Sequence, residues 1–135
     1  MDCVAPKIFI GNTLEANSRE ALERDLIRAT ICLDGCMKNV QASDLGLEEI
    51  VVVPLEDGPG NSLLRFYHAV SELRRLVHTY PRVLVHCHAG ISRSAALVTR
   101  YLMEEERLNA EDAFARVKQL RRKVMLTPGI EELLN

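Results

Sequence analysis

The sequence contains no long apolar run, and none of its hydrophobic stretches approaches the ~20 residues that a membrane-spanning helix needs. Residues 1–7 carry no basic region followed by an apolar stretch, so no secretory signal is expected there. Neither sign of charge dominates, because 17 Lys and Arg oppose 19 Asp and Glu for a formal net charge of −2. These features predict no membrane insertion, and they argue against a nucleic acid partner, which would favour a basic surface.

Cysteine is too scarce for a disulfide framework. The chain has four cysteines in 135 residues, and its 47% hydrophobic content is enough to build a core without cross-links. We therefore expect free thiols and a reducing, cytoplasmic location. Repeats, low-complexity tracts and linker-like shifts of composition are also absent, so residues 1–135 are expected to form a single domain and a monomer.

Apolar runs alternate with helical patterns along the chain, which is typical of an α/β domain. The predicted fold is a central, mainly parallel sheet of about four to five strands flanked by helices. Residues 50–53 are β-branched and apolar on both faces, which indicates a buried parallel strand. The expected strands are 8–10, 30–33, 50–53 and 83–85. One helix is expected from a cap at Asn17 or Ser18 to about residue 28, and a longer one from Asn61 or Ser62 to about residue 80. Further helices are expected after residue 93 and from a cap at Asn109, and residues 127–129 open a short last segment.

The most informative segment is a loop between the strand at 83–85 and the helix that follows it. It reads His86-Cys87-His88-Ala89-Gly90-Ile91-Ser92-Arg93-Ser94. A compact loop that opens a helix favours anion binding, because backbone N–H groups and the helix dipole face the anion. Gly90 allows a tight turn or a close approach, and the Arg93 fork can bond two phosphoryl oxygens at once. The predicted substrate-binding residues are therefore His88, Ala89, Gly90, Ile91, Ser92 and Arg93.

Cys87 is the predicted nucleophile, because helix N-termini and nearby cations favour the thiolate form of a cysteine. Ser94 is predicted to donate a hydrogen bond to the sulfur and to stabilise it when it leaves. His86 is predicted to order the loop through hydrogen bonds rather than to act as a base. A lone cysteine after a strand is usually a small buried hydrophobe, but the His before it and Arg93 after it favour catalysis.

Asp57 is the predicted general acid, and later the base that activates water. Its segment follows the strand at 50–53, so it should lie at the same carboxyl edge of the sheet as the cysteine loop. The neighbouring Glu56 is an alternative candidate for the general acid. Asp57 can also be interpreted as a simple turn residue before Gly-Pro.

The histidines on either side of Cys87, together with Cys32 and Cys36, are residue types that bind zinc. Adjacent residues of an extended segment point to opposite faces, and no Cys-x-x-Cys pair occurs. We therefore predict no metal and no cofactor. Cys32 and Cys36 are expected to be core thiols, with a disulfide to Cys87 as an alternative, and residues 121–123 are expected to be a solvated helix end.

The pattern His86-Cys87-(five residues)-Arg93-Ser94, with Asp57 thirty residues upstream, resembles the dual-specificity branch of the protein tyrosine phosphatases. The resemblance extends over nearly the whole chain. It implies a phosphocysteine on Cys87, phosphoryl binding by Arg93, proton donation by Asp57 and no metal. Two segments depart from the family pattern: 127–130, where a Pro-Asn pair is frequent, and 33–36, where an Asn-containing turn is usual.

The resemblance favours a phosphatase of phosphotyrosine, and of phosphoserine and phosphothreonine, in phosphorylated protein substrates. A domain this short resembles small atypical members that lack a kinase-docking module and the loops that deepen a tyrosine-only pocket. Three alternatives remain: a phosphoinositide or other non-protein phosphatase, a non-catalytic phosphoresidue-binding module, and a sulfur-transfer enzyme with a rhodanese-like loop, in which Asp57 has no evident role.

Overall fold

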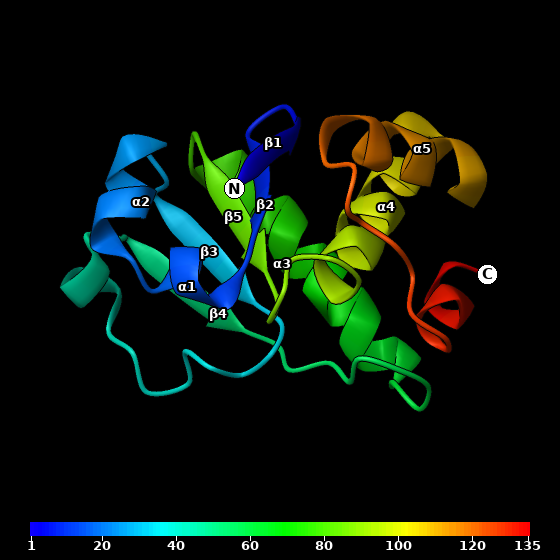
Figure 1. Cartoon of the computed structure of the whole chain (residues 1–135), viewed down its shortest axis with the longest axis horizontal. Helices are drawn as coiled ribbons and strands as arrows, with labels where there is room; N and C mark the ends of the chain where they lie inside the picture. Colours follow the sequence, from blue (N-terminus) through cyan, green and yellow to red (C-terminus); the bar gives the residue numbers. More distant parts are fainter.

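A five-stranded sheet runs through the molecule, with helices on both of its faces (Figure 1). The computed structural model describes all residues, 1–135. The strands are β1 (Asp2–Ala5), β2 (Ile8–Gly11), β3 (Ala29–Cys32), β4 (Glu49–Val52) and β5 (Val83–His86). Their order is β1-β2-β5-β3-β4, and only β1 is antiparallel to its neighbour. The predicted α/β fold with a mainly parallel sheet is confirmed.

The helices that follow the strands have clear start signals in the sequence. Ser18, Ser62 and Asn109 each accept a hydrogen bond from the backbone N–H three residues later, as N-cap residues do. The helical elements are α1 (Thr13–Ala16), α2 (Arg19–Arg24), η1 (Ala42–Leu45), α3 (Leu63–Thr79), α4 (Arg93–Glu106), α5 (Ala110–Leu120) and η2 (Ile130–Leu134). None of them is both long enough and apolar enough to cross a bilayer.

The core has two parts, because successive strand residues point to opposite faces of the sheet. On one face Ile10, Ile31 and Val85 pack against buried residues of α3, α4 and α5. On the other, Phe9 and Leu84 pack with apolar residues of α1, α2 and the loop before η1. The central strand β5 is buried along its whole length. It therefore holds the residue that follows it in a fixed position.

Three sequence-based expectations differ from the structure. Strand β4 lies at the sheet edge, and all its residues are half-buried rather than buried. Helix α2 ends at Arg24 rather than near residue 28, because Leu26 adopts a positive φ of 56°. The short elements β1 and α1 are additions to the predicted set.

Candidate active site

Cys87 follows the last residue of β5, and α4 begins six residues later at Arg93. The Cys87 side chain is buried, with 2% of its surface exposed. Its Sγ lies 3.2 Å from the Oγ of Ser94, in the first turn of α4. The strand, loop and helix that the sequence predicts are all present, and the hydroxyl of Ser94 lies within hydrogen-bonding distance of the sulfur.

Carbonyls of the loop have hydrogen-bond partners within the protein, whereas its N–H groups have no backbone partner. No N–H of residues 88–92 donates to a backbone carbonyl. The carbonyls, in contrast, accept hydrogen bonds from outside the loop: His88 O from Thr13 N at 3.0 Å, and Ile91 O from Met125 N at 3.1 Å. The free N–H groups at the N-terminus of α4 form a concave, electropositive site suited to an oxyanion.

Gly90 shapes the loop but does not line the pocket. Its φ is +67°, and a Cβ at this position would lie 2.5 Å from the carbonyl oxygen of Gly11. The close approach that requires glycine is therefore to strand β2 and not to a ligand. Arg121, whose side chain is buried, donates from Nε to the Gly90 oxygen at 2.8 Å and fixes this part of the loop.

Arg93 lies at the edge of the pocket. Its Nη1 donates to the carbonyl of Leu55 at 3.1 Å, and its buried Nε has no hydrogen-bond partner. The pocket has a volume of about 320 Å³. Its lining residues are Asp57, Cys87, His88, Ala89, Ile91, Ser92, Arg93, Met125 and Thr127.

Asp57 is exposed and joins the same pocket from the segment after β4. Its Oδ1 accepts a hydrogen bond of 2.8 Å from the Oγ1 of Thr127. The backbone N–H of Thr127 donates in turn to the Oγ of Ser92 at 3.0 Å. Thr127 thus links the Asp57 segment to the cysteine loop, and no motif in the sequence indicates this role.

His86 points to the opposite side of the sheet from Cys87. Its ring is fully buried, and burial lowers its pKa to about 4, so the imidazole is neutral. Nε2 lies 3.0 Å from the Sδ of Met37, and Nδ1 has no partner. The ring makes no hydrogen bond to the loop. The prediction that its side chain braces the loop is therefore not met. Its backbone is held instead, by pairing with β2 and β3 and by Leu33 N, which donates to its oxygen at 2.9 Å.

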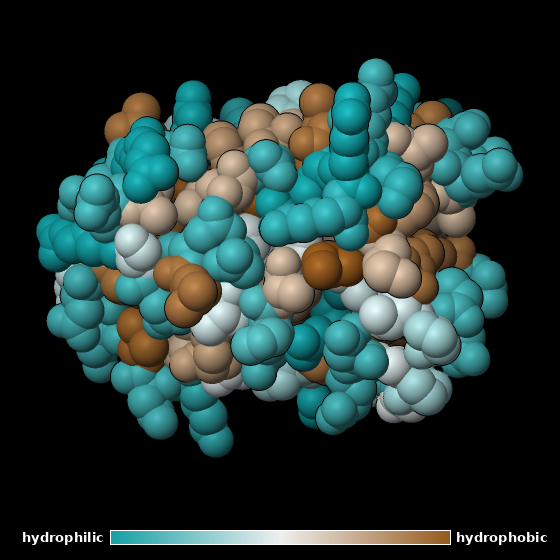
Figure 2. Space-filling view, viewed as in Figure 1, coloured by the Kyte–Doolittle hydropathy of each residue, from teal (hydrophilic) through white to brown (hydrophobic).

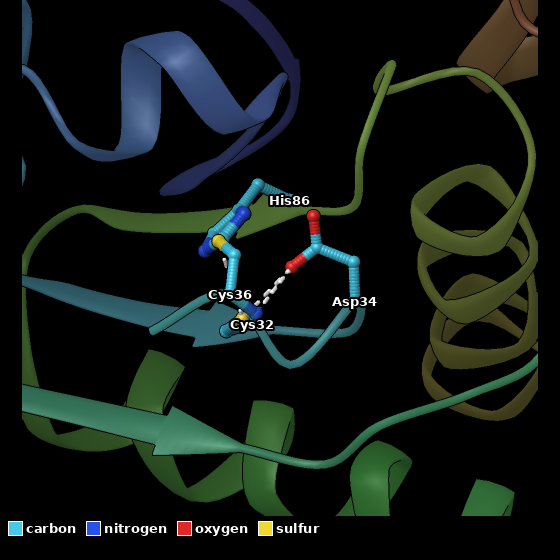
Figure 3. A group of neighbouring side chains, drawn as sticks. All are labelled: Cys32, Asp34, Cys36 and His86. Atoms are coloured by element: carbon cyan, nitrogen blue, oxygen red, sulfur yellow. Dashed lines mark hydrogen bonds between the residues drawn. The ribbon is translucent and has the colours of Figure 1, made fainter. Parts of the chain in front are cut away.

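His86 lies instead beside the loop that follows β3, where Figure 3 shows it with Cys32, Asp34 and Cys36. Burial raises the pKa of Cys32 to about 12 and also raises the pKa of Cys36. Burial acts to raise the pKa of Asp34, but hydrogen bonds from Thr13 and from the Cys36 backbone hold it well below its usual range. Cys36 is exposed, so the prediction of a core thiol is correct for Cys32 alone.

A family model for the catalytic domain of dual specificity phosphatases matches residues 8–135. The chain belongs to this family. It is a dual-specificity protein phosphatase, as the cysteine loop indicated, and the family acts on phosphorylated proteins.

Known relatives agree with this assignment. Mouse dual specificity protein phosphatase 18 is 31% identical over 132 residues, which are 97% of this chain and 69% of the relative. Human dual specificity protein phosphatase 4 is 32% identical over 128 residues, and the chain spans only 31% of its length. The crystal structure of human DUSP28 superposes with a TM-score of 0.84 at 30% identity, covering 99% of this chain and 92% of that one.

Two residues of this phosphatase stabilise the site although no sequence pattern predicts that role for them. Thr127 contacts Asp57 and Ser92, as described above. Arg121 was expected in a solvated helix end, but it is 4% exposed and bonds both Gly90 O and the Asp2 carboxylate. That prediction is wrong for Arg121, because β1 packs against α5 and covers it.

Proposed function

We propose that residues 1–135 form one catalytic domain that hydrolyses phosphotyrosine, and also phosphoserine and phosphothreonine, in protein substrates. The observation that supports it is the convergence of Cys87, Arg93 and Asp57 on one pocket. Their side chains come from two segments that are far apart in the sequence. A nucleophile, an oxyanion-binding group and a proton donor are the three parts that this hydrolysis requires.

In the first step the Cys87 thiolate attacks phosphorus. A P–S bond forms while the ester P–O bond breaks, and Asp57 donates its proton to the leaving oxygen. The N–H groups of the loop and the Arg93 guanidinium stabilise the charge that collects on the phosphoryl oxygens. This step releases the alcohol or phenol of the substrate and leaves a phosphocysteine.

In the second step Asp57, now a carboxylate, removes a proton from water. The water oxygen attacks phosphorus, the P–S bond breaks, and inorganic phosphate is formed. The Ser94 hydroxyl, 3.2 Å from Sγ, donates a hydrogen bond to the departing thiolate. No metal or cofactor takes part in either step.

Protein substrates are favoured over phosphoinositides by the lining of the pocket. Arg93 is its only Lys or Arg side chain, and the rest of the wall comprises residues such as Ala89, Ile91 and Met125. A headgroup with several phosphates would find no second cation there. We expect higher kcat/KM on phosphopeptides than on phosphoinositides when the two are assayed side by side; the reverse would favour the lipid alternative.

We infer further that the phosphatase acts as a monomer in the cytoplasm. All four cysteines are free thiols, which suits a reducing compartment. Its large exposed apolar side chains are few, and Figure 2 shows them in small groups on a largely hydrophilic face. Sedimentation at working concentration tests the monomer, and a dimer would contradict it.

The catalytic assignment is tested with Cys87→Ser and Asp57→Asn, with Cys3→Ser as a matched control at an exposed cysteine. Cys87→Ser should abolish turnover of both aryl and alkyl phosphates. Asp57→Asn should lower kcat by about 10²–10⁴-fold on alkyl phosphates, and less on p-nitrophenyl phosphate, whose leaving group needs no proton. Full activity of Cys87→Ser would overturn the proposal.

A further inference from the structure

Four side chains able to bind a metal gather on the face of β5 opposite the cysteine loop. They are Cys32, Asp34, Cys36 and His86, and one ligand atom from each lies within 4.8 Å of the others (Figure 3). Two come from the end of β3 and β5, and two from the loop after β3. The catalytic steps proposed above use none of them.

The distances between the ligand atoms are close to those around a tetrahedral zinc ion. Two thiolates at ~2.3 Å from zinc are about 3.8 Å apart. The Sγ atoms of Cys32 and Cys36 lie 3.9 Å apart. The Cys32 Sγ lies 3.2 Å from the Oδ1 of Asp34, so the carboxylate needs to move only a few tenths of an ångström.

His86 provides the observation that points most directly to a ligand. Its ring is fully buried, and Nδ1 has no hydrogen-bond partner, which is uncommon for a buried polar atom. If Nε2 carries the proton, it faces the Sδ of Met37 at 3.0 Å and leaves the lone pair of Nδ1 available. Metal-bound histidines are held in this way, with the second nitrogen donating to a neighbour.

We propose that Cys32, Asp34, Cys36 and His86 bind one zinc ion. Two sulfurs and an imidazole favour zinc over magnesium or calcium, which prefer oxygen ligands. As the two Zn–S bonds form, the two thiol protons pass to water. The exposed side chain of Cys36 gives the ion a path from solvent.

The sequence-based prediction of no metal rested on the missing Cys-x-x-Cys pair. The ligands here follow a Cys-x-Asp-x-Cys spacing instead. The fourth ligand, His86, is brought to them by the parallel pairing of β3 with β5, in which Cys32 lies opposite His86. That pairing cannot be read from the spacing of the residues.

Thr13 connects the proposed zinc site to the phosphate-binding loop. The Oδ2 of Asp34 accepts a 2.6 Å hydrogen bond from Thr13, whose backbone N–H holds the His88 carbonyl. His86 is joined to Cys87 through one peptide bond. A bound ion would therefore stiffen the base of the loop, and zinc should raise the melting temperature of the folded protein.

The test is titration of the reduced full chain with zinc chloride by calorimetry, in a buffer with a phosphine reductant and no thiols. We expect one zinc per chain. Cys36→Ser and Asp34→Asn should weaken binding at least about tenfold. Cys3→Ser and Cys87→Ser should leave the affinity unchanged, and the second of these separates this site from zinc bound at the nucleophile.

Cobalt(II) gives a second readout that does not depend on affinity or on activity. The bound cobalt should show thiolate-to-metal charge-transfer absorption, and Cys36→Ser should reduce it. Circular dichroism and thermal melting of Cys36→Ser check its fold, which should be intact because the side chain is exposed.

Three results would overturn the proposal: no binding by either metal, unchanged affinity in Cys36→Ser, or loss of binding in Cys87→Ser. Isolation of a Cys32–Cys36 disulfide that persists under the reductant would also overturn it. Because no outcome depends on turnover, the zinc site and the proposed catalytic function fail independently.

Discussion

At the scale of single residues, the site depends on contacts that fix the cysteine loop and the acid in one arrangement. Thr127 makes two of them, to Asp57 and to Ser92, at 2.8 and 3.0 Å. Arg121 makes a third, to the Gly90 carbonyl. The Thr127 hydroxyl also lies 2.9 Å from the Ser92 hydroxyl, so a conservative substitution of Thr127 removes its side-chain bonds and leaves the backbone bond.

Thr127→Val removes the hydroxyl that bonds both Asp57 and the Ser92 hydroxyl, and it keeps the backbone N–H that holds Ser92. The hydrogen bond to Asp57 contributes about 0.5–1.5 kcal/mol, which is roughly twofold to tenfold in rate. We expect kcat on alkyl phosphates to fall by that factor, with KM nearly unchanged. In an Asp57→Asn background the same substitution should have no further effect, and an equal loss there would contradict a role through Asp57.

Gly90→Ala adds a Cβ where the oxygen of Gly11 lies 2.5 Å away, at a φ of +67°. The left-handed backbone costs about 1–2 kcal/mol and overpacking about 1–3 kcal/mol more. The matched control is Gly60→Ala, which has a φ of +92° and no atom within 4 Å of the added Cβ. Urea unfolding should show a clearly larger loss for Gly90→Ala, and equal losses would mean that the contact with β2 is unimportant.

At the scale of elements, the edge strand β4 is held to the end of α3 by side chains. Glu49, its first residue, pairs with Arg75 and accepts a 2.8 Å hydrogen bond from the hydroxyl of Tyr80. These contacts, that with Arg75 foremost, lower the pKa of the Glu49 carboxyl. Strand β4 pairs with β3 alone, so the contacts of Glu49 with Arg75 and Tyr80 stabilise a strand that has no second neighbour.

Glu49→Gln should therefore reduce the free energy of unfolding at pH 7 by up to about 1 kcal/mol, since the pair is partly exposed. A lowered pKa gives stability that is present above the unfolded value of 4.5 and is lost as pH falls through the folded value. The difference between wild type and variant should thus vanish in acid. Urea unfolding at pH 7 and at a series of lower pH values measures it, and a difference that does not shrink as the pH falls would contradict the ionic origin.

The sequence predicted the elements whose signals are local. The N-cap residues Ser62 and Asn109 stand next to the helices that they begin. The segment from β5 to Arg93 is likewise continuous in the sequence. The position of β4 at the sheet edge depends on the order of the strands, and the hydrophobic pattern of the sequence does not determine that order. Asp57 could be predicted because strand ends share one edge, whereas Thr127 and Arg121 reach the loop only through packing of the C-terminal segments.

At the scale of the whole molecule, binding of an oxyanion is linked to folding. The N–H groups of residues 88–92 donate to no backbone carbonyl and are therefore available to a bound anion. Inorganic phosphate at 100 times its Kd should stabilise the fold by about 2.7 kcal/mol. Thermal melting in phosphate should show this rise for wild type but little for Arg93→Met, and an equal rise in chloride of matched ionic strength would contradict specific binding.

The hydrogen bonds between Asp57, Thr127 and Ser92 are made by protein atoms alone, so they need no ligand to form. A pocket assembled in advance requires no segment to close over the ligand, and little ordering entropy is lost when the ligand enters. The observed association rate should then rise in proportion to ligand concentration, with no plateau from a slow rearrangement. Diffusion, rather than movement of a loop, would then limit the rate at which the phosphatase binds a phosphorylated residue.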